Sequence, residues 1–172
     1  MNPTHNPPRA ALGDITPADI LRCAAHYLQT HGWIQGNYYP PTTTDAFPSA
    51  CVVGAISMAT FGRLTYAPLD LPYEQRRDFN RALDVLIDYL TRTEPCDDDE
   101  DPLPDDDRHS PFEWNDRPGR TLDQVLTTLT EAADDYDWTH ATEEDLETYA
   151  DACVWAEKHP TREGFLAWLG AR

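Results

Sequence analysis

The sequence predicts an all-α fold, a single compact domain of five to six helices with a buried central helix and an acidic loop. Apolar residues recur at helical spacing along most of the chain, and several of these segments begin at a Thr or Ser of the type that caps helices. No convincing run alternates between polar and apolar residues as a strand would. The 172 residues, 40% of them hydrophobic, are enough to bury one core without a metal or disulfides.

The first helix is expected over residues 17–31. Thr16 supplies a capping hydroxyl, Pro17 suits the first turn, and Gly32 supplies the stop. The segment that follows is rich in Gly, Pro and aromatic residues, so we expect an ordered loop with a short extended piece at Trp33 and Ile34.

Ser49 is predicted to open the second helix and Gly62 to close it. Residues 52–61 are apolar on nearly every face, which is typical of a buried central helix. Gly54, in the middle of this segment, would let a neighbouring helix approach closely.

A third, amphipathic helix is expected from Pro72 to about Arg92, with an apolar face that includes Phe79, Leu86 and Leu90. The composition then changes abruptly, because eight carboxylates fall within residues 97–107. They are Asp97, Asp98, Asp99, Glu100, Asp101, Asp105, Asp106 and Asp107. Such a run repels itself and stays solvated, so residues 95–111 are predicted to form an extended acidic loop.

Three further helices are expected after this loop. Thr121 and Gln124 form a capping box that starts a helix running to Tyr136. Thr142 starts the next helix, which is expected to stop at His159-Pro160, and Thr161 caps a short last one. Residues 1–13 are predicted to be a disordered tail, residues 14–172 a single helical domain, and residues 141–172 its C-terminal helical extension.

The charge balance restricts the classes of partner. With 31 acidic and 13 basic residues, the net charge of −18 repels nucleic-acid phosphate and anionic lipid, so we expect no direct nucleic-acid binding and no membrane binding. A basic protein partner is favoured instead, and the eight carboxylates of residues 97–107 are candidate binding residues. A solvated loop is the more frequent explanation of such a run, and adaptation to salt would give a similar composition.

The chain is expected to be cytoplasmic. No signal-peptide pattern opens the sequence, and no apolar run approaches the roughly 20 residues of a membrane span. The four cysteines are widely spaced and form no C-x-x-C pair, which favours reduced thiols.

Cys51 is the candidate nucleophile. A Cys in the first turn of a helix meets free backbone N–H groups that stabilise a thiolate and can serve as an oxyanion hole. Asn115 or Asp116 could orient the reacting groups, and His31 or His109 could act as the base. The more common role for such a Cys is that of a small buried core residue.

The stretch WNDRPGRT, residues 114–121, is predicted to form a turn that leads into a helix. Arg117 and Arg120 flank the bend, where they could bind a carboxylate or phosphate or pair with the acidic run just upstream. Trp33 and Trp114 complete the candidate binding residues.

No metal site is predicted. Cys23 and His26 have a spacing that suits two ligands, but no second pair at metal-ligand spacing accompanies them. The common nucleotide-binding and hydrolase motifs are absent from the sequence, so no cofactor is expected.

Three blocks of sequence resemble a family of uncharacterised proteins from actinobacteria and their phages, the domain of unknown function numbered 6197. The matching residues are Gly32, Trp33 and Gly36; Cys51, Gly54 and Ala55; and Asn115, Asp116, Gly119, Arg120 and Thr121. The resemblance covers residues 20–133 and implies a helical fold, without an assigned activity.

These observations lead to two hypotheses of function. The leading hypothesis is an acidic, non-enzymatic binding or regulatory protein that engages a basic partner, in a phage or mobile-element setting. The alternative is a Cys-dependent hydrolase or transferase with Cys51 as its nucleophile.

Overall fold

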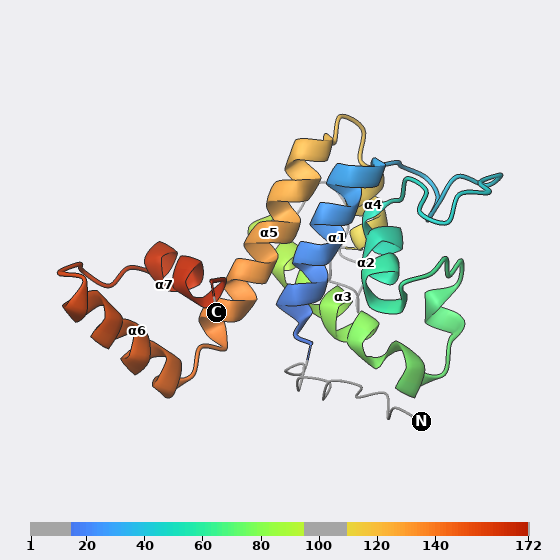
Figure 1. Ribbon diagram of the computed structural model, residues 1–172. Helices are drawn as coiled ribbons and strands as arrows, with labels where there is room; N and C mark the ends of the chain where they lie inside the picture. Colours follow the sequence, from blue (N-terminus) through green and yellow to red (C-terminus); the bar gives the residue numbers. More distant parts are fainter. Residues whose placement is uncertain (1–14, 95–109, 172) are drawn as a thin grey trace, which may run out of the picture.

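The computed structural model describes residues 15–94 and 110–171, and the predicted tail and acidic run lie outside these described residues. The elements are α1 (Pro17–His31), α2 (Val52–Phe61), the 3₁₀ turn η1 (Pro68–Asp70), α3 (Tyr73–Thr93), α4 (Pro111–Asp116), α5 (Leu122–Thr139), α6 (Glu143–Trp155) and α7 (Arg162–Leu169) (Figure 1). Within the described ranges there is no strand beyond one isolated bridge between Trp33 and Ala50, so the all-α prediction is confirmed.

Helix α2 forms the centre of the core, as its composition predicted. Every residue from Val52 to Met58 is buried, and α1 and α3 both pack against it. Helices α1 and α5 lie side by side along their length, with α3 behind them (Figure 1). The predicted capping box of Thr121 with Gln124 is present, and the predicted cap Thr16 also forms a capping box, with Asp19.

The start of α2 differs from the prediction. Cys51, not Ser49, is the N-cap residue, and its Sγ accepts the Gly54 N–H at 3.4 Å. The chain before it is extended: the Ala50 N–H donates to the Gly32 carbonyl at 3.1 Å, and the Ile34 N–H donates to the Ala50 carbonyl at 3.0 Å. Because these bonds hold residue 50 beside the extended piece at Trp33, the helix cannot begin earlier.

Gly54 does mark a close approach, but the neighbour is a loop and not a helix. A Cβ atom at residue 54 would collide with the backbone carbonyl oxygen of Tyr38. The same Tyr38 carbonyl accepts the Cys51 N–H at 3.1 Å. The loop after α1 is therefore laid directly on the first turn of α2.

Residues 111–116 form helix α4, where the sequence predicted the end of a loop and a turn. Ser110 caps this helix by accepting the Glu113 N–H, and Pro111 occupies its first turn. Thus the described residues contain seven α-helices instead of five or six. The bend expected from Pro118-Gly119 follows the helix instead of replacing it.

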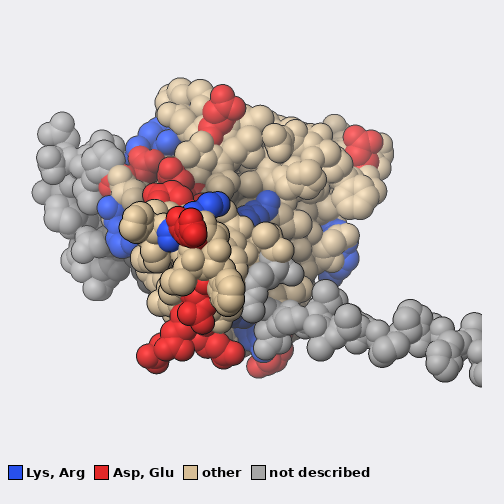
Figure 2. Space-filling view, turned by 60° about the vertical axis from the view of Figure 1, so that its left-hand side comes forward, with Lys and Arg blue, Asp and Glu red and all other residues tan. Residues whose placement is uncertain are grey.

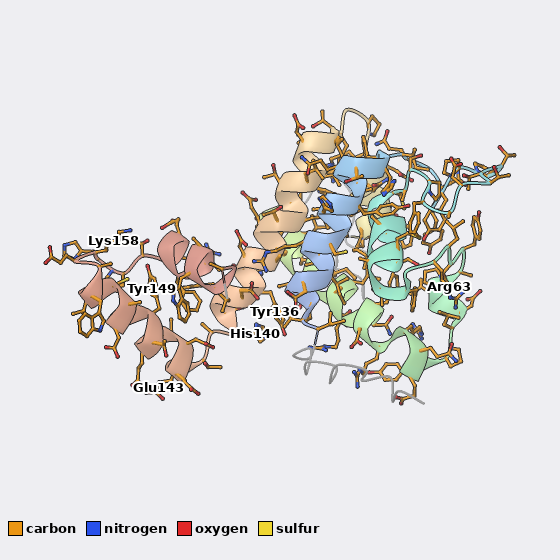
Figure 3. The ribbon with its side chains drawn as sticks, viewed as in Figure 1. Arg63, Tyr136, His140, Glu143, Tyr149 and Lys158 are labelled. Atoms are coloured by element: carbon orange, nitrogen blue, oxygen red, sulfur yellow. The ribbon has the colours of Figure 1, made fainter. Side chains whose placement is uncertain are left out.

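Helices α6 and α7 form a second, smaller cluster at the far end of α5 (Figure 1). Its buried residues are Tyr149, Cys153 and Phe165, and Tyr149 points from α6 toward α7 (Figure 3). Helix α6 ends at Trp155, earlier than the predicted stop at His159-Pro160. Glu157 adopts a positive φ of 53°, which turns the chain and lets the Lys158 N–H donate to the Cys153 carbonyl at 2.9 Å.

None of the helices in the described part of the chain has the length and apolar character needed to cross a membrane.

Candidate functional site

Helix α4 places the side chain of Asn115 at the meeting point of three segments. Asn115 is 1% exposed, and its Oδ1 accepts two hydrogen bonds, from the Trp33 indole N–H at 2.7 Å and from the Val52 backbone N–H at 3.0 Å. Its Nδ2 donates to the Ile34 carbonyl at 3.3 Å and to Asp116 Oδ1 at 2.7 Å. One amide side chain thus joins the loop after α1, the start of α2 and α4.

Residues next to Asn115 strengthen this junction. Asp116 Oδ1 also accepts the Gly36 N–H at 2.8 Å, and Gly36 has a φ of +84° that favours glycine. The Gln35 amide donates to the Asn115 carbonyl at 2.8 Å and to the Arg117 carbonyl at 3.2 Å. The three sequence blocks that carry the family resemblance therefore meet in space, although 63 to 82 residues separate Asn115 from Val52 and Trp33.

Cys51 lies at this junction but is 3% exposed. Burial raises the pKa of its thiol, and the negative charge of Asp116 raises it further, against the opposing effect of hydrogen bonds from the Gly54 and Val53 N–H groups. A raised pKa disfavours the thiolate, which is the nucleophilic form. The physical effect of this environment is opposite to the activation that a catalytic cysteine requires.

The groups that would assist Cys51 are partly assembled. Asn115 and Asp116 do reach the start of α2. However, the Val52 N–H already donates to Asn115 and the Gly54 N–H already donates to the Cys51 sulfur, so neither is free to serve in an oxyanion hole. His31 is exposed, and its ring stacks with that of Phe47 and lies tilted against that of Tyr27; in the described structure no hydrogen bond joins it to Cys51. His109 lies outside the described residues.

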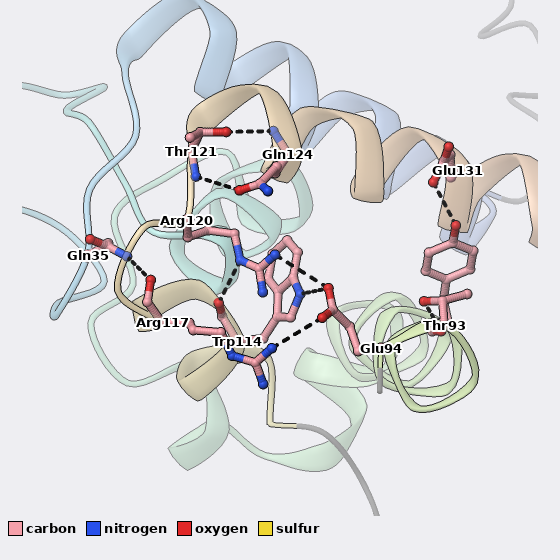
Figure 4. Close-up of polar contacts among 10 residues, drawn as sticks. Gln35, Thr93, Glu94, Trp114, Arg117, Arg120, Thr121, Gln124 and Glu131 are labelled. Atoms are coloured by element: carbon pink, nitrogen blue, oxygen red, sulfur yellow. Dashed lines mark hydrogen bonds and ion pairs between the residues drawn. The ribbon is translucent and has the colours of Figure 1, made fainter. Parts of the chain in front are cut away.

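A second polar cluster surrounds Glu94, the residue that follows α3 (Figure 4). Glu94 Oε1 accepts the Trp114 indole N–H at 2.7 Å and lies 3.4 Å from the Arg120 guanidinium; Oε2 lies 3.3 Å from that of Arg117. From the sequence, these arginines were expected to bind a carboxylate or phosphate, or to pair with the acidic run. Within the described residues the carboxylate is Glu94, which precedes the run and was not among the predicted site residues.

Arg120 is held by further contacts inside the protein. Its guanidinium lies over the Trp114 ring, 4.1 Å from the centroid, and its Nε donates to the Trp114 carbonyl at 3.1 Å. The side chain is only 9% exposed. Arg120 and Trp114 thus tie α4 and the following bend to the end of α3, and the only sequence signal for Glu94 was a carboxylate at the end of an amphipathic helix.

The positive charges of the described chain are largely neutralised by carboxylates of the same chain. Seven arginines form such ion pairs, namely Arg22, Arg77, Arg81, Arg92, Arg117, Arg120 and Arg162. By contrast, helix α6 contains no Lys or Arg. Its residues Glu143, Glu144, Glu147 and Asp151 are exposed, and none of them has a cationic partner among the described residues.

Figure 2 turns the end of the molecule that carries α6 and α7 toward the viewer. Carboxylates largely without adjacent Lys or Arg gather in the lower part of this face, whereas those in its middle and left parts lie beside Lys and Arg; the rest of the face is a larger uncharged surface. The face therefore combines residual negative charge with exposed uncharged area.

The described residues contain no group of three or more His, Cys, Asp or Glu side chains that could hold a metal ion. Cys23 is exposed on α1, and Cys51 and Cys153 are buried; all three are free thiols.

A family model described as "Family of unknown function (DUF6197)" matches residues 13–135. The matched part contains α1 to α4, most of α5 and all three sequence blocks that meet at Asn115, whereas α6 and α7 lie beyond it. No curated protein and no solved structure matches the chain.

Proposed function

The chain belongs to the DUF6197 family, whose function is unknown, and from its charge distribution we propose that it is a small acidic protein that binds a basic protein partner in a non-enzymatic, regulatory role. The observation that carries this proposal is the set of exposed carboxylates on α6 that no cation of the described chain neutralises. Charges left unpaired on a protein surface attract partners of opposite sign and steer their approach.

The net charge supports the same proposal. At −18, the chain repels nucleic acids and anionic membranes, and its described arginines are mostly committed to internal pairs. The eight carboxylates of residues 97–107, which lie outside the described residues, add to the negative field. A partner with clustered Lys or Arg is the class of molecule that gains most from binding this surface.

The geometry around Cys51 gives a further reason to prefer binding over catalysis. Asn115 is buried and bonded through both its amide oxygen and its amide nitrogen to groups of the same chain. Such a side chain has the role of a structural connector, and the raised pKa of Cys51 does not favour a nucleophile.

The experiment is capture of proteins from an extract of the source cells on the immobilised chain. Binding is compared at 0.1 M and 1 M salt, because this increase shortens the electrostatic screening length from about 10 Å to about 3 Å. We expect specific capture of a protein with a basic surface at the lower salt and its release at the higher salt. Polyglutamate of matched net charge is the control for non-specific attraction. Capture that is insensitive to salt, or no capture beyond the polyglutamate control, would refute the proposal.

We also propose a cytoplasmic location, because the described cysteines are free thiols, as a reducing compartment would keep them. An actinobacterial or phage setting is proposed from the sequence resemblance. The neighbouring genes in the source genome would test it.

A further inference from the structure

We infer that the outward face of α6 is the docking surface for a basic amphipathic helix of the partner, with Trp155 and Val154 as its apolar anchor. This inference rests on the proposed function and adds the location of the surface and the chemistry of the partner segment.

The apolar part of the surface lies near the C-terminal end of α6. Trp155 is 89% exposed and Val154 is 75% exposed, and Leu146 on the same helix is 40% exposed. Burying such apolar side chains against a partner stabilises a complex, because it removes apolar surface from water. Trp is also the residue type most enriched at the energetic centre of protein interfaces.

The inner face of α6 is already occupied. Tyr149 and Cys153 are buried against α7, where Tyr149 contacts Phe165 and Trp168 (Figure 3). Glu143 marks the start of α6 and Lys158 lies beyond its end, so the surface between them runs the length of the helix (Figure 3). The face available to a partner is therefore the one that points away from α7.

Two rows of residues at four-residue spacing make up this outward face. One row is acidic and ends in the indole: Glu143, Glu147, Asp151 and Trp155. The adjacent row is apolar: Leu146, Ala150 and Val154. The rows span about 18 Å, or three turns of helix, at 1.5 Å per residue.

Parallel rows of this kind fit the ridges of another helix. A partner helix that places Lys or Arg opposite the acidic row and Leu-like residues opposite the apolar row would satisfy both. A second copy of this chain is a poorer occupant, because two copies of α6 would bring two rows of carboxylates together. An anionic membrane is repelled for the same reason.

The test uses the full chain and a synthetic 18-residue peptide with Leu on one helical face and Arg on the other. The matched probe is a peptide of the same composition in scrambled order, which has no apolar face. Binding is measured by fluorescence anisotropy of the labelled peptides at low salt. We expect the amphipathic peptide to bind at least roughly tenfold more tightly than the scrambled one.

Two double variants test the surface. Trp155→Ser with Val154→Ser should weaken binding of the amphipathic peptide roughly tenfold or more, and Glu147→Gln with Asp151→Asn should weaken binding and flatten its salt dependence. The control is Tyr73→Ser with Glu74→Gln, which changes an exposed aromatic residue and an exposed carboxylate at the start of α3. All the altered side chains are exposed, so the midpoint of urea unfolding should be the same for every variant as for the unaltered chain.

Each opposing outcome has a distinct meaning. If the amphipathic peptide binds the Trp155–Val154 variant as tightly as it binds the control variant, the docking surface is wrong while the proposed function stands. If the scrambled peptide binds equally well, the inference that the partner segment is an amphipathic helix is wrong. If the chain instead dimerises in solution and the Trp155→Ser, Val154→Ser variant is monomeric, a second copy is the occupant. If neither peptide nor any basic protein binds at low salt, the proposed function itself fails.

Discussion

Replacing Asn115 by Ala should destabilise the protein more than any surface change of similar size. The substitution removes the acceptor of the Trp33 indole N–H and of the Val52 backbone N–H, and it removes the donor to the Ile34 carbonyl. Val52 is fully buried, so water cannot replace the lost partner of its N–H. The effect comes from polar groups left without partners and not from lost apolar contact.

The magnitude follows from the number of orphaned groups. Each buried donor or acceptor left unsatisfied costs about 1–3 kcal/mol. The Val52 N–H belongs at the upper end of that range, and the Trp33 indole, which is partly exposed, belongs at the lower end. We therefore expect the free energy of unfolding to fall by about 2–5 kcal/mol, a large share of the roughly 5–15 kcal/mol typical of a domain.

Urea unfolding followed by far-UV circular dichroism measures this change. With a denaturant dependence of about 2 kcal/mol per molar, the midpoint for Asn115→Ala should drop by roughly 1–2.5 M. Asn37→Ala is the matched control, because Asn37 is exposed in the loop after α1, and its midpoint should stay within the range of a neutral surface change. Equal midpoints for the two variants would refute the assignment of Asn115 as the central connector.

Three further predictions concern other positions. Gly54→Ala should lower the free energy of unfolding by about 1–3 kcal/mol, because the new methyl group meets a loop carbonyl oxygen; an unchanged urea midpoint would contradict this packing. In the folded protein Cys51 should react with iodoacetamide far more slowly than the exposed Cys23, and its reaction should accelerate only above the ordinary thiol pKa, because burial raises the pKa of Cys51. Fast alkylation of Cys51 near pH 7 would support the alternative hypothesis of a cysteine-dependent enzyme. Glu94→Gln should lower the melting temperature by several degrees, since it removes the charge that faces two guanidiniums, whereas Asp84→Asn at an exposed site of α3 should not.

The local features of the fold were predictable from the sequence. Thr16 and Thr121 cap their helices through bonds that reach only three residues along the chain, and Gly32 ends α1 through a bond to Leu28. The apolar run after Cys51 requires burial on all sides whatever its neighbours are. Information that is local in sequence was sufficient in these cases.

The sequence placed Asn115 near the start of α2 only within the hypothesis of a Cys51 site. Its hydrogen bonds to Val52 and Trp33 were not predictable, because these partners lie 63 and 82 residues away and no periodic pattern links them. The start of α2 was misplaced for a related reason: Ser49 has the chemistry of a cap, but the pairing of Ala50 with the segment at Trp33 holds the chain extended there. Likewise, Asn115-Asp116 and Pro118-Gly119 favour turns, which concealed the short helix α4. Tertiary contacts decided each of these positions.

The contacts of Asn115 also constrain the order in which the protein can fold. Synthesis on the ribosome proceeds from the N-terminus, so α1, the following loop and α2 emerge well before α4. Until residue 115 is available, the first N–H of the central helix lacks its partner, and Glu94 lacks both arginines. Contacts of such long sequence separation form late, since the entropy of closing the intervening chain must be overcome first. Completion of the core is therefore delayed until a six-residue helix two-thirds of the way along the chain has been made.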